Sequence, residues 1–123
     1  MSSFKLFNLQ PIIQSTLDAL GFVTPTEIQE KAIPLLLEAT RIDFHGQAQT
    51  GTGKTLAFGI PLLNKIDKTK KITQALIVAP TRELALQIAD SLRQVAQPAG
   101  IIVEPVYGGV SMEEQIQIGR AHV

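Results

Sequence analysis

The sequence contains no cysteine, and only two of its 123 residues are histidine. The lack of cysteine excludes disulfide scaffolds, zinc-ribbon sites and thiol catalysis. Two histidines argue against histidine-rich metal sites and most Ser-His-Asp schemes. No apolar run approaches the ~20 residues of a membrane span, and the N-terminus lacks the apolar stretch of a signal peptide. We therefore expect a soluble, cytoplasmic chain.

The charges balance, and the composition is that of a folded protein. Eleven basic residues match eleven acidic ones, so the formal net charge is zero. This balance excludes a polycation of the histone type, and any contact with nucleic acid must come from a local site. With 45% hydrophobic and 18% charged residues, the sequence lacks the composition of a disordered chain. Its length allows one domain with a real core.

Helical and strand patterns alternate along most of the chain. Apolar residues at helical spacing predict helices, and short apolar runs bounded by breakers predict strands. We expect helices over residues 9–20, 26–37, 54–66, 83–96 and 111–118, and strands over 42–48, 75–79 and 101–106. The continuous apolar run at 75–79 is typical of a strand buried on both faces. The alternation after residue 40 predicts an α/β fold with a parallel sheet of about three strands.

The strongest motif lies between the first predicted strand and the helix that follows it. It reads Ala48-Gln49-Thr50-Gly51-Thr52-Gly53-Lys54-Thr55. Its glycines let phosphate oxygens approach the main chain, and the amide groups and the helix N-terminus attract the anion. Lys54 would reach the β- and γ-phosphates, and the Thr55 hydroxyl would bind Mg²⁺. The usual pattern has glycine where this chain has Ala48, but the context still predicts a phosphate-binding loop.

A second cluster, at residues 21–29, has two interpretations. Thr26 and Gln29 have the spacing of a helix capping box, in which Gln29 reaches back to the helix start. The Gln29 amide also has the donor and the acceptor needed to hold adenine. Phe22 would then stack on the adenine ring, although a lone phenylalanine is more often a core residue.

Two clusters follow the later predicted strands. Arg82 comes after Pro80 and Thr81, and ligands of parallel sheets bind beyond the carboxyl ends of strands. Arg82 is therefore either a ligand of a phosphate or a carboxylate, or a surface side chain near Glu83. The segment Tyr107-Gly108-Gly109 is either a plain turn or a set of main-chain donors for a nucleic-acid backbone.

Taken in order, these segments resemble the first RecA-like domain of DEAD-box ATP-dependent RNA helicases over essentially all 123 residues. Residues 21–29 resemble the Q motif, with Phe4 as the isolated aromatic residue upstream. Residues 48–55 resemble the family's own form of the phosphate loop, which has alanine at its first position. Residues 80–85 resemble motif Ia, and Gly108-Gly109 resembles the family's paired glycines.

The resemblance implies ATP and Mg²⁺ as cofactors and RNA as the partner. The nucleotide would be bound by the Q motif and the phosphate loop, that is by Phe4, Phe22, Thr26, Gln29, Gln49, Thr50, Gly51, Thr52, Gly53, Lys54 and Thr55. Of these, Lys54 and Thr55 would take part in catalysis, with Thr55 as a metal ligand. The RNA backbone would be contacted, with little sequence preference, by Pro80, Thr81, Arg82, Gly108 and Gly109. The chain would divide into a Q-motif helical segment, residues 1–38, and part of a RecA-like domain, residues 39–123.

The chain also departs from the family pattern. His45 lies in the first predicted strand, where the family usually has an apolar residue. The Asp-Glu-Ala-Asp and Ser-Ala-Thr motifs are absent from these 123 residues, as is a second RecA-like domain with its arginine fingers. We therefore expect a truncated sheet and no ATP hydrolysis by this chain alone, because carboxylates must hold Mg²⁺ and orient the attacking water. A non-catalytic nucleotide- or RNA-binding remnant and a helicase acting on DNA stay open as alternatives.

Overall fold

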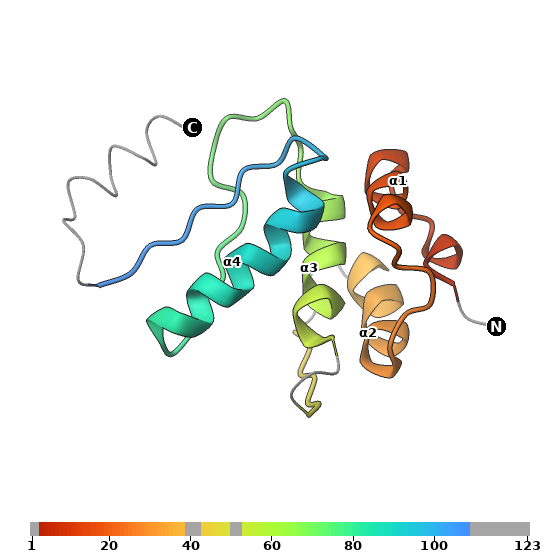
Figure 1. Ribbon diagram of the computed structural model, residues 1–123, viewed down its shortest axis with the longest axis horizontal. Coiled ribbons are helices and arrows are strands. Elements are labelled where there is room, and N and C mark those ends of the chain that lie inside the picture. Colours follow the sequence, from red (N-terminus) through yellow and green to blue (C-terminus); the bar gives the residue numbers. More distant parts are fainter. Residues whose placement is uncertain (1–2, 39–42, 50–52, 109–123) are drawn as a thin grey trace. The chain divides into compact units, whose positions relative to one another are not determined.

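The computed structural model describes residues 3–38, 43–49 and 53–108. Within them the chain forms a short 3-10 helix and four α-helices (Figure 1): η1 (Phe4–Phe7), α1 (Pro11–Ala19), α2 (Glu27–Glu38), α3 (Lys54–Lys65) and α4 (Arg82–Ala96). The chain divides into two compact units, Met1–Lys65 and Ile66–Val123, which are described separately below. The division predicted from the sequence, between residues 38 and 39, stays a prediction.

The four helices predicted before residue 97 are confirmed to within one or two residues at each end. Pro11 lies in the first turn of α1, where its missing N–H costs nothing. Pro34 and Pro61 lie inside α2 and α3, and both helices continue through them. The predicted helix at 111–118 lies outside the described residues. Among the described helices, none combines the length and the apolar character that crossing a membrane requires.

The first unit is a small helical assembly with an apolar core. Within it α2 packs along α3, α1 also contacts α3, and η1 contacts α1 (Figure 1). The largest side chains that are almost fully buried in this unit are Phe4, Ile13, Leu17, Ile33 and Ile60. Burying a side chain of this size stabilises the fold by about 1.5–3 kcal/mol. Apolar burial therefore holds these helices together.

Polar contacts join the ends of these helices. The Gln10 main-chain N–H donates to Asn64 Oδ1 at 2.7 Å, and Gln10 Nε2 donates to the Asn64 carbonyl at 2.6 Å. These bonds tie the start of α1 to the end of α3. Lys65 Nζ donates to the Leu36 carbonyl at 2.6 Å, which ties the ends of α2 and α3. The register of the three helices is thus fixed at that end.

The second unit is organised around α4. Thr81 caps this helix, since its Oγ1 accepts a hydrogen bond from the Leu84 N–H at 3.1 Å. The buried face of α4 consists of Ala89, Leu92, Val95 and Ala96. Arg93 Nε donates to the Val103 carbonyl at 2.9 Å, so the segment after α4 returns along the helix.

The predicted three-stranded sheet is not confirmed, because the described parts of its segments carry no strand. The expectation that residues 75–79 are buried on both faces is wrong for this chain. Leu76 is 84% exposed and Val78 is 85% exposed. The physical reason is that a strand buries both faces only within a sheet that helices cover on each side, and the described residues form no strand. Residues 101–108 alternate between half-buried and exposed side chains, which is the period of an extended chain with one covered face.

Candidate functional site

The beginning of α2 is a capping box. The Thr26 N–H donates to Gln29 Oε1 at 2.9 Å, and the Gln29 N–H donates to Thr26 Oγ1 at 3.4 Å. Each side chain thereby accepts a hydrogen bond from the main-chain N–H of the other residue at the helix start. Gln29 is only 5% exposed. The structural interpretation of the Thr26 and Gln29 spacing is therefore confirmed.

The Gln29 amide also contacts the segment of the predicted phosphate loop. Its Nε2 donates to the Gly53 carbonyl at 3.2 Å. That carbonyl also accepts from the Ala57 N–H at 3.1 Å, in the first turn of α3. The orientation of the amide follows from its partners, because Oε1 faces a donor and Nε2 faces an acceptor. Each end of the amide keeps further capacity, namely a second N–H and a second lone pair.

Gly53 lies where a side chain would be strained and would displace the Gln29 amide. Its φ is +83°, and a Cβ placed there would lie 2.5 Å from Gln29 Nε2 and 3.0 Å from Thr26 Oγ1. Glycine is favoured here for two reasons, namely the left-handed backbone conformation and the close approach of the capping box. This contact brings the segment that resembles the Q motif against the end of the segment that resembles the phosphate loop.

Lys54 and Thr55 of the predicted phosphate loop lie in the first turn of α3. Lys54 is exposed on the first turn, and Thr55 is half-buried beside it. The helix begins directly after Gly53, so its first N–H groups lack helical partners and its N-terminus carries a partial positive charge. Gln49 is exposed, and Thr50, Gly51 and Thr52 lie outside the described residues.

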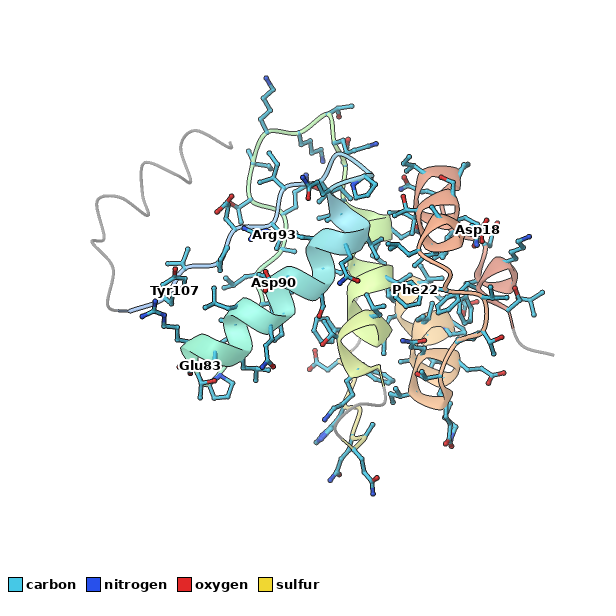
Figure 2. All side chains as sticks on the ribbon, in the orientation of Figure 1. Asp18, Phe22, Glu83, Asp90, Arg93 and Tyr107 are labelled. Atoms are coloured by element: carbon cyan, nitrogen blue, oxygen red, sulfur yellow. The ribbon has the colours of Figure 1, made fainter. Side chains whose placement is uncertain are left out.

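The two aromatic residues predicted to help bind the nucleotide have different surroundings. Phe4 is 1% exposed, its N–H donates to the Val23 carbonyl at 3.2 Å, and its ring contacts the Phe7 ring edge to face at 5.7 Å. Phe4 is thus a core residue of the first unit. Phe22, which is labelled in Figure 2, is half-buried. The part of either ring in binding a nucleotide stays a prediction.

The predicted RNA-binding residues lie in the second unit. Pro80, Thr81 and Arg82 are exposed at the start of α4, Gly108 is exposed, and Gly109 lies outside the described residues. The Arg82 guanidinium carbon lies 4.6 Å from the centroid of the Tyr107 ring. The structure therefore brings the segment that resembles motif Ia together with the residue before the glycine pair.

Two contacts of these residues were missed by the sequence reasoning. No pattern indicated that Gln29 would donate to the Gly53 carbonyl, because the two residues are far apart in sequence. The aromatic partner of Arg82 was also missed, although Arg82 and Tyr107 both follow predicted strands, which was the available signal. His45 is exposed. Among the described residues, no three acidic, histidine or cysteine side chains gather as metal ligands would.

Comparison with solved structures defines the class of protein. The chain superposes on a DEAD box protein from Methanococcus jannaschii with a TM-score of 0.83 at 36% identity, over 95% of this chain and 32% of that one. It also matches Dbp5 of S. cerevisiae bound to RNA and ADP BeF3, with a TM-score of 0.76 at 30% identity, over 91% of this chain and 30% of that one. The fold is therefore that of the RecA-like domain of DEAD-box helicases.

Sequence comparison defines the family. A model of the DEAD/DEAH box helicase family matches residues 26–122, and the chain belongs to this family. It is 47% identical over 117 residues to the ATP-dependent RNA helicase CshA of Listeria monocytogenes, covering 95% of this chain and 22% of that protein. The chain spans between 22% and 26% of the length of the curated relatives that it matches.

Proposed function

We propose that this chain is the part of a cytoplasmic DEAD-box ATP-dependent RNA helicase that binds ATP and the RNA backbone. The observation that carries the proposal is the hydrogen bond from Gln29 Nε2 to the Gly53 carbonyl at 3.2 Å. It joins the residue proposed to read adenine to the loop proposed to hold the phosphates. A base-reading group and a phosphate-binding group must lie side by side to grip one nucleotide.

The residues present fit ATP with Mg²⁺. Gly53 carries no side chain beside the Gln29 amide, and the first N–H groups of α3, which begins at the next residue, can bind an anion. Lys54 would hold the β- and γ-phosphates, and the Thr55 hydroxyl would be a ligand of Mg²⁺. When bound, the ion supplies positive charge that neutralises the phosphates.

Selection of adenine is proposed to use the spare capacity of the Gln29 amide. One N–H and one lone pair already bond to Gly53 and Thr26. The second N–H would donate to adenine N7, and the second lone pair would accept from the adenine N6 amino group. Because guanine has a carbonyl in place of that amino group, the amide would favour ATP over GTP. Thr26 and Gly53 then act by fixing the amide in place.

The RNA is proposed to contact the second unit through its phosphates. Arg82 would donate to phosphate oxygens, and the Thr81 hydroxyl hydrogen can donate while its oxygen caps α4. Gly108 and Gly109 would offer main-chain N–H groups. These are contacts to the backbone, which position a nucleic acid without reading its sequence. Hydrolysis and strand separation are proposed to need the second RecA-like domain, so this chain alone turns over no ATP.

The proposal is tested by titrating fluorescent ATP and GTP into the chain and its variants. Gln29→Glu keeps the capping acceptor for Thr26, because Glu also serves in this box, but removes the amide donor. We expect Gln29→Glu to lower the preference for ATP over GTP by about tenfold. We expect Lys54→Ala to weaken the binding of both nucleotides. The matched control is Gln14→Glu, a half-buried glutamine of α1 outside the proposed nucleotide site, and we expect this change to leave nucleotide binding unaltered.

Two results would contradict the proposal. One is equal affinity of the unaltered chain for ATP and GTP, which would show that Gln29 does not select adenine. The other is a rate of phosphate release above that of Lys54→Ala, which would show that the missing carboxylates are dispensable. Binding of RNA and of DNA of the same sequence is compared in parallel, because a preference for DNA would favour the DNA-helicase alternative.

A further inference from the structure

Arg82 and Tyr107 form a cation–π pair in the second unit. The guanidinium carbon lies over the ring at 4.6 Å from its centroid, well inside the distance of about 6 Å at which such pairs attract. Arg82 is exposed, and Tyr107 is half-buried. Figure 2 shows Tyr107 near the end of α4 at which Glu83 lies, beside the first turn of that helix. An exposed arginine would otherwise sample many rotamers.

The ring is held in place from α4 itself. Arg93 Nε donates to the Val103 carbonyl at 2.9 Å, and Arg93 Nη2 lies 3.7 Å from Glu104 Oε2. These contacts tether the extended segment to the last turn of α4. Tyr107 follows on the same segment, so its ring reaches the first turn of the helix. Arg82 therefore meets a support that belongs to the same unit.

A ring over the guanidinium carbon leaves the donors of the arginine usable. The five N–H groups of a guanidinium lie in its plane, whereas the aromatic ring attracts the cation through its π face. A phosphate can thus accept two parallel hydrogen bonds from the edge of the same group. A partner carboxylate would instead have consumed those donors and neutralised the charge.

We infer that Tyr107 is a positioning residue for RNA binding, whose ring holds the Arg82 guanidinium ready for a backbone phosphate. The inference rests on the proposed function, in which Arg82 is an RNA ligand. Tyr107 acts through Arg82 and need not contact the RNA. Because the ring already restricts the rotamers of Arg82, the side chain loses less conformational entropy when the phosphate binds.

The test is a double-mutant cycle on binding of single-stranded oligouridylate to the chain, measured by fluorescence anisotropy at low salt. Tyr107→Leu removes the aromatic face, and we expect about three- to fivefold weaker binding. Tyr107→Phe keeps the face and should bind as the unaltered chain does. Tyr107→Trp, with the strongest cation–π ring, should bind at least as tightly. In the Arg82→Ala background, Tyr107→Leu should cause no further loss.

Each result decides between support and refutation. An equal loss from Tyr107→Leu with and without Arg82, or no loss at all, overturns the positioning role. The salt dependence gives a second readout. The slope of log affinity against log salt concentration should fall by the equivalent of about one phosphate contact in Arg82→Ala and stay the same in Tyr107→Phe. If Arg82→Ala itself binds RNA as the unaltered chain does, the proposed function of Arg82 fails, which is a different result from failure of Tyr107 alone. Circular dichroism checks that each variant keeps its helices. If Tyr107→Leu loses its helices, the comparison of Tyr107→Phe and Tyr107→Trp with the unaltered chain still tests the role of the ring.

Discussion

The two units of this chain treat their apolar side chains differently. In the first unit Leu17 and Ile33 are fully buried among helices, whereas in the second unit Leu76 and Val78 are 84% and 85% exposed. Helices complete their backbone hydrogen bonds within one segment, so three of them suffice to close a small core. Extended segments need neighbours to bond with and to cover them. The difference shows that the helices of the first unit cover their apolar side chains, whereas the extended segment at residues 75–79 of the second unit leaves Leu76 and Val78 exposed.

We expect the largest difference in stability when one apolar side chain is shortened in each unit. Ile33→Ala removes a fully buried side chain and should lower the free energy of unfolding by about 2–5 kcal/mol. Val78→Ala changes an exposed side chain and should stay within about 0.5 kcal/mol. Urea denaturation followed by circular dichroism measures both. Comparable losses would mean that residues 75–79 are covered in solution, and the contrast between the units would fail.

A second experiment compares two glycines with nearly the same backbone conformation. Gly21 has φ +81° with no atom within 4 Å of an added Cβ, whereas Gly53 has φ +83° with Gln29 Nε2 at 2.5 Å. Alanine at either position costs about 1–2 kcal/mol for the left-handed conformation. Gly53→Ala should cost about 1 kcal/mol more, because it displaces the Gln29 amide from its hydrogen bond.

Nucleotide affinity separates the two glycines further. Gly53→Ala should weaken ATP binding, since the capping box and the loop can no longer meet, and Gly21→Ala should leave it unchanged once the protein is folded. The measurements are urea denaturation for stability and fluorescent ATP titration for binding. Identical losses for the two variants would show that the contact between Gln29 and Gly53 contributes nothing.

Local signals in the sequence predicted the described helices and one of their caps. Thr26 and Gln29 form the capping box that their spacing predicts. The cap of α4 by Thr81 was not predicted, because Thr81 was named only as an RNA contact. Such signals are readable because the partners lie within one helical turn. The links from Gln29 to Gly53 and from Arg82 to Tyr107 join distant residues, and no local pattern encodes them.

The sheet was the weakest prediction for the same reason. The apolar run at 75–79 predicts a buried strand, but burial depends on what packs against it rather than on the run itself. Family resemblance supplied the RecA-like fold, which the comparison with solved structures supports. The resemblance also named the candidate residues, whereas the contacts among those residues came from the structure.

The smallest expected effect concerns the polar loop that begins the second unit. Asp67 Oδ1 accepts hydrogen bonds from the Thr69 hydroxyl at 2.6 Å and from the Thr69 N–H at 3.0 Å. These bonds hold the pKa of the Asp67 carboxyl below its ordinary value of 3.8. In the first unit, the Lys31 ammonium hydrogen-bonds Glu27 at 2.9 Å and lowers the pKa of that carboxyl too. Thr69→Val should therefore raise the pKa of Asp67 and leave that of Glu27 unchanged.

The sign of the pH dependence follows from these lowered pKa values. Each carboxyl binds its proton more weakly in the folded chain than in the unfolded chain, so its contribution to stability is present above the unfolded pKa. That contribution is lost as the pH falls through the folded pKa. Both groups are exposed, so the effect is small and screened by salt. Carboxyl NMR shifts between neutral and strongly acidic pH measure the two groups separately. A Thr69→Val chain in which the Asp67 pKa did not rise would show that the Thr69 hydroxyl does not order this loop, leaving Gln74, which bonds Asp67 through both amide atoms, as the group that does.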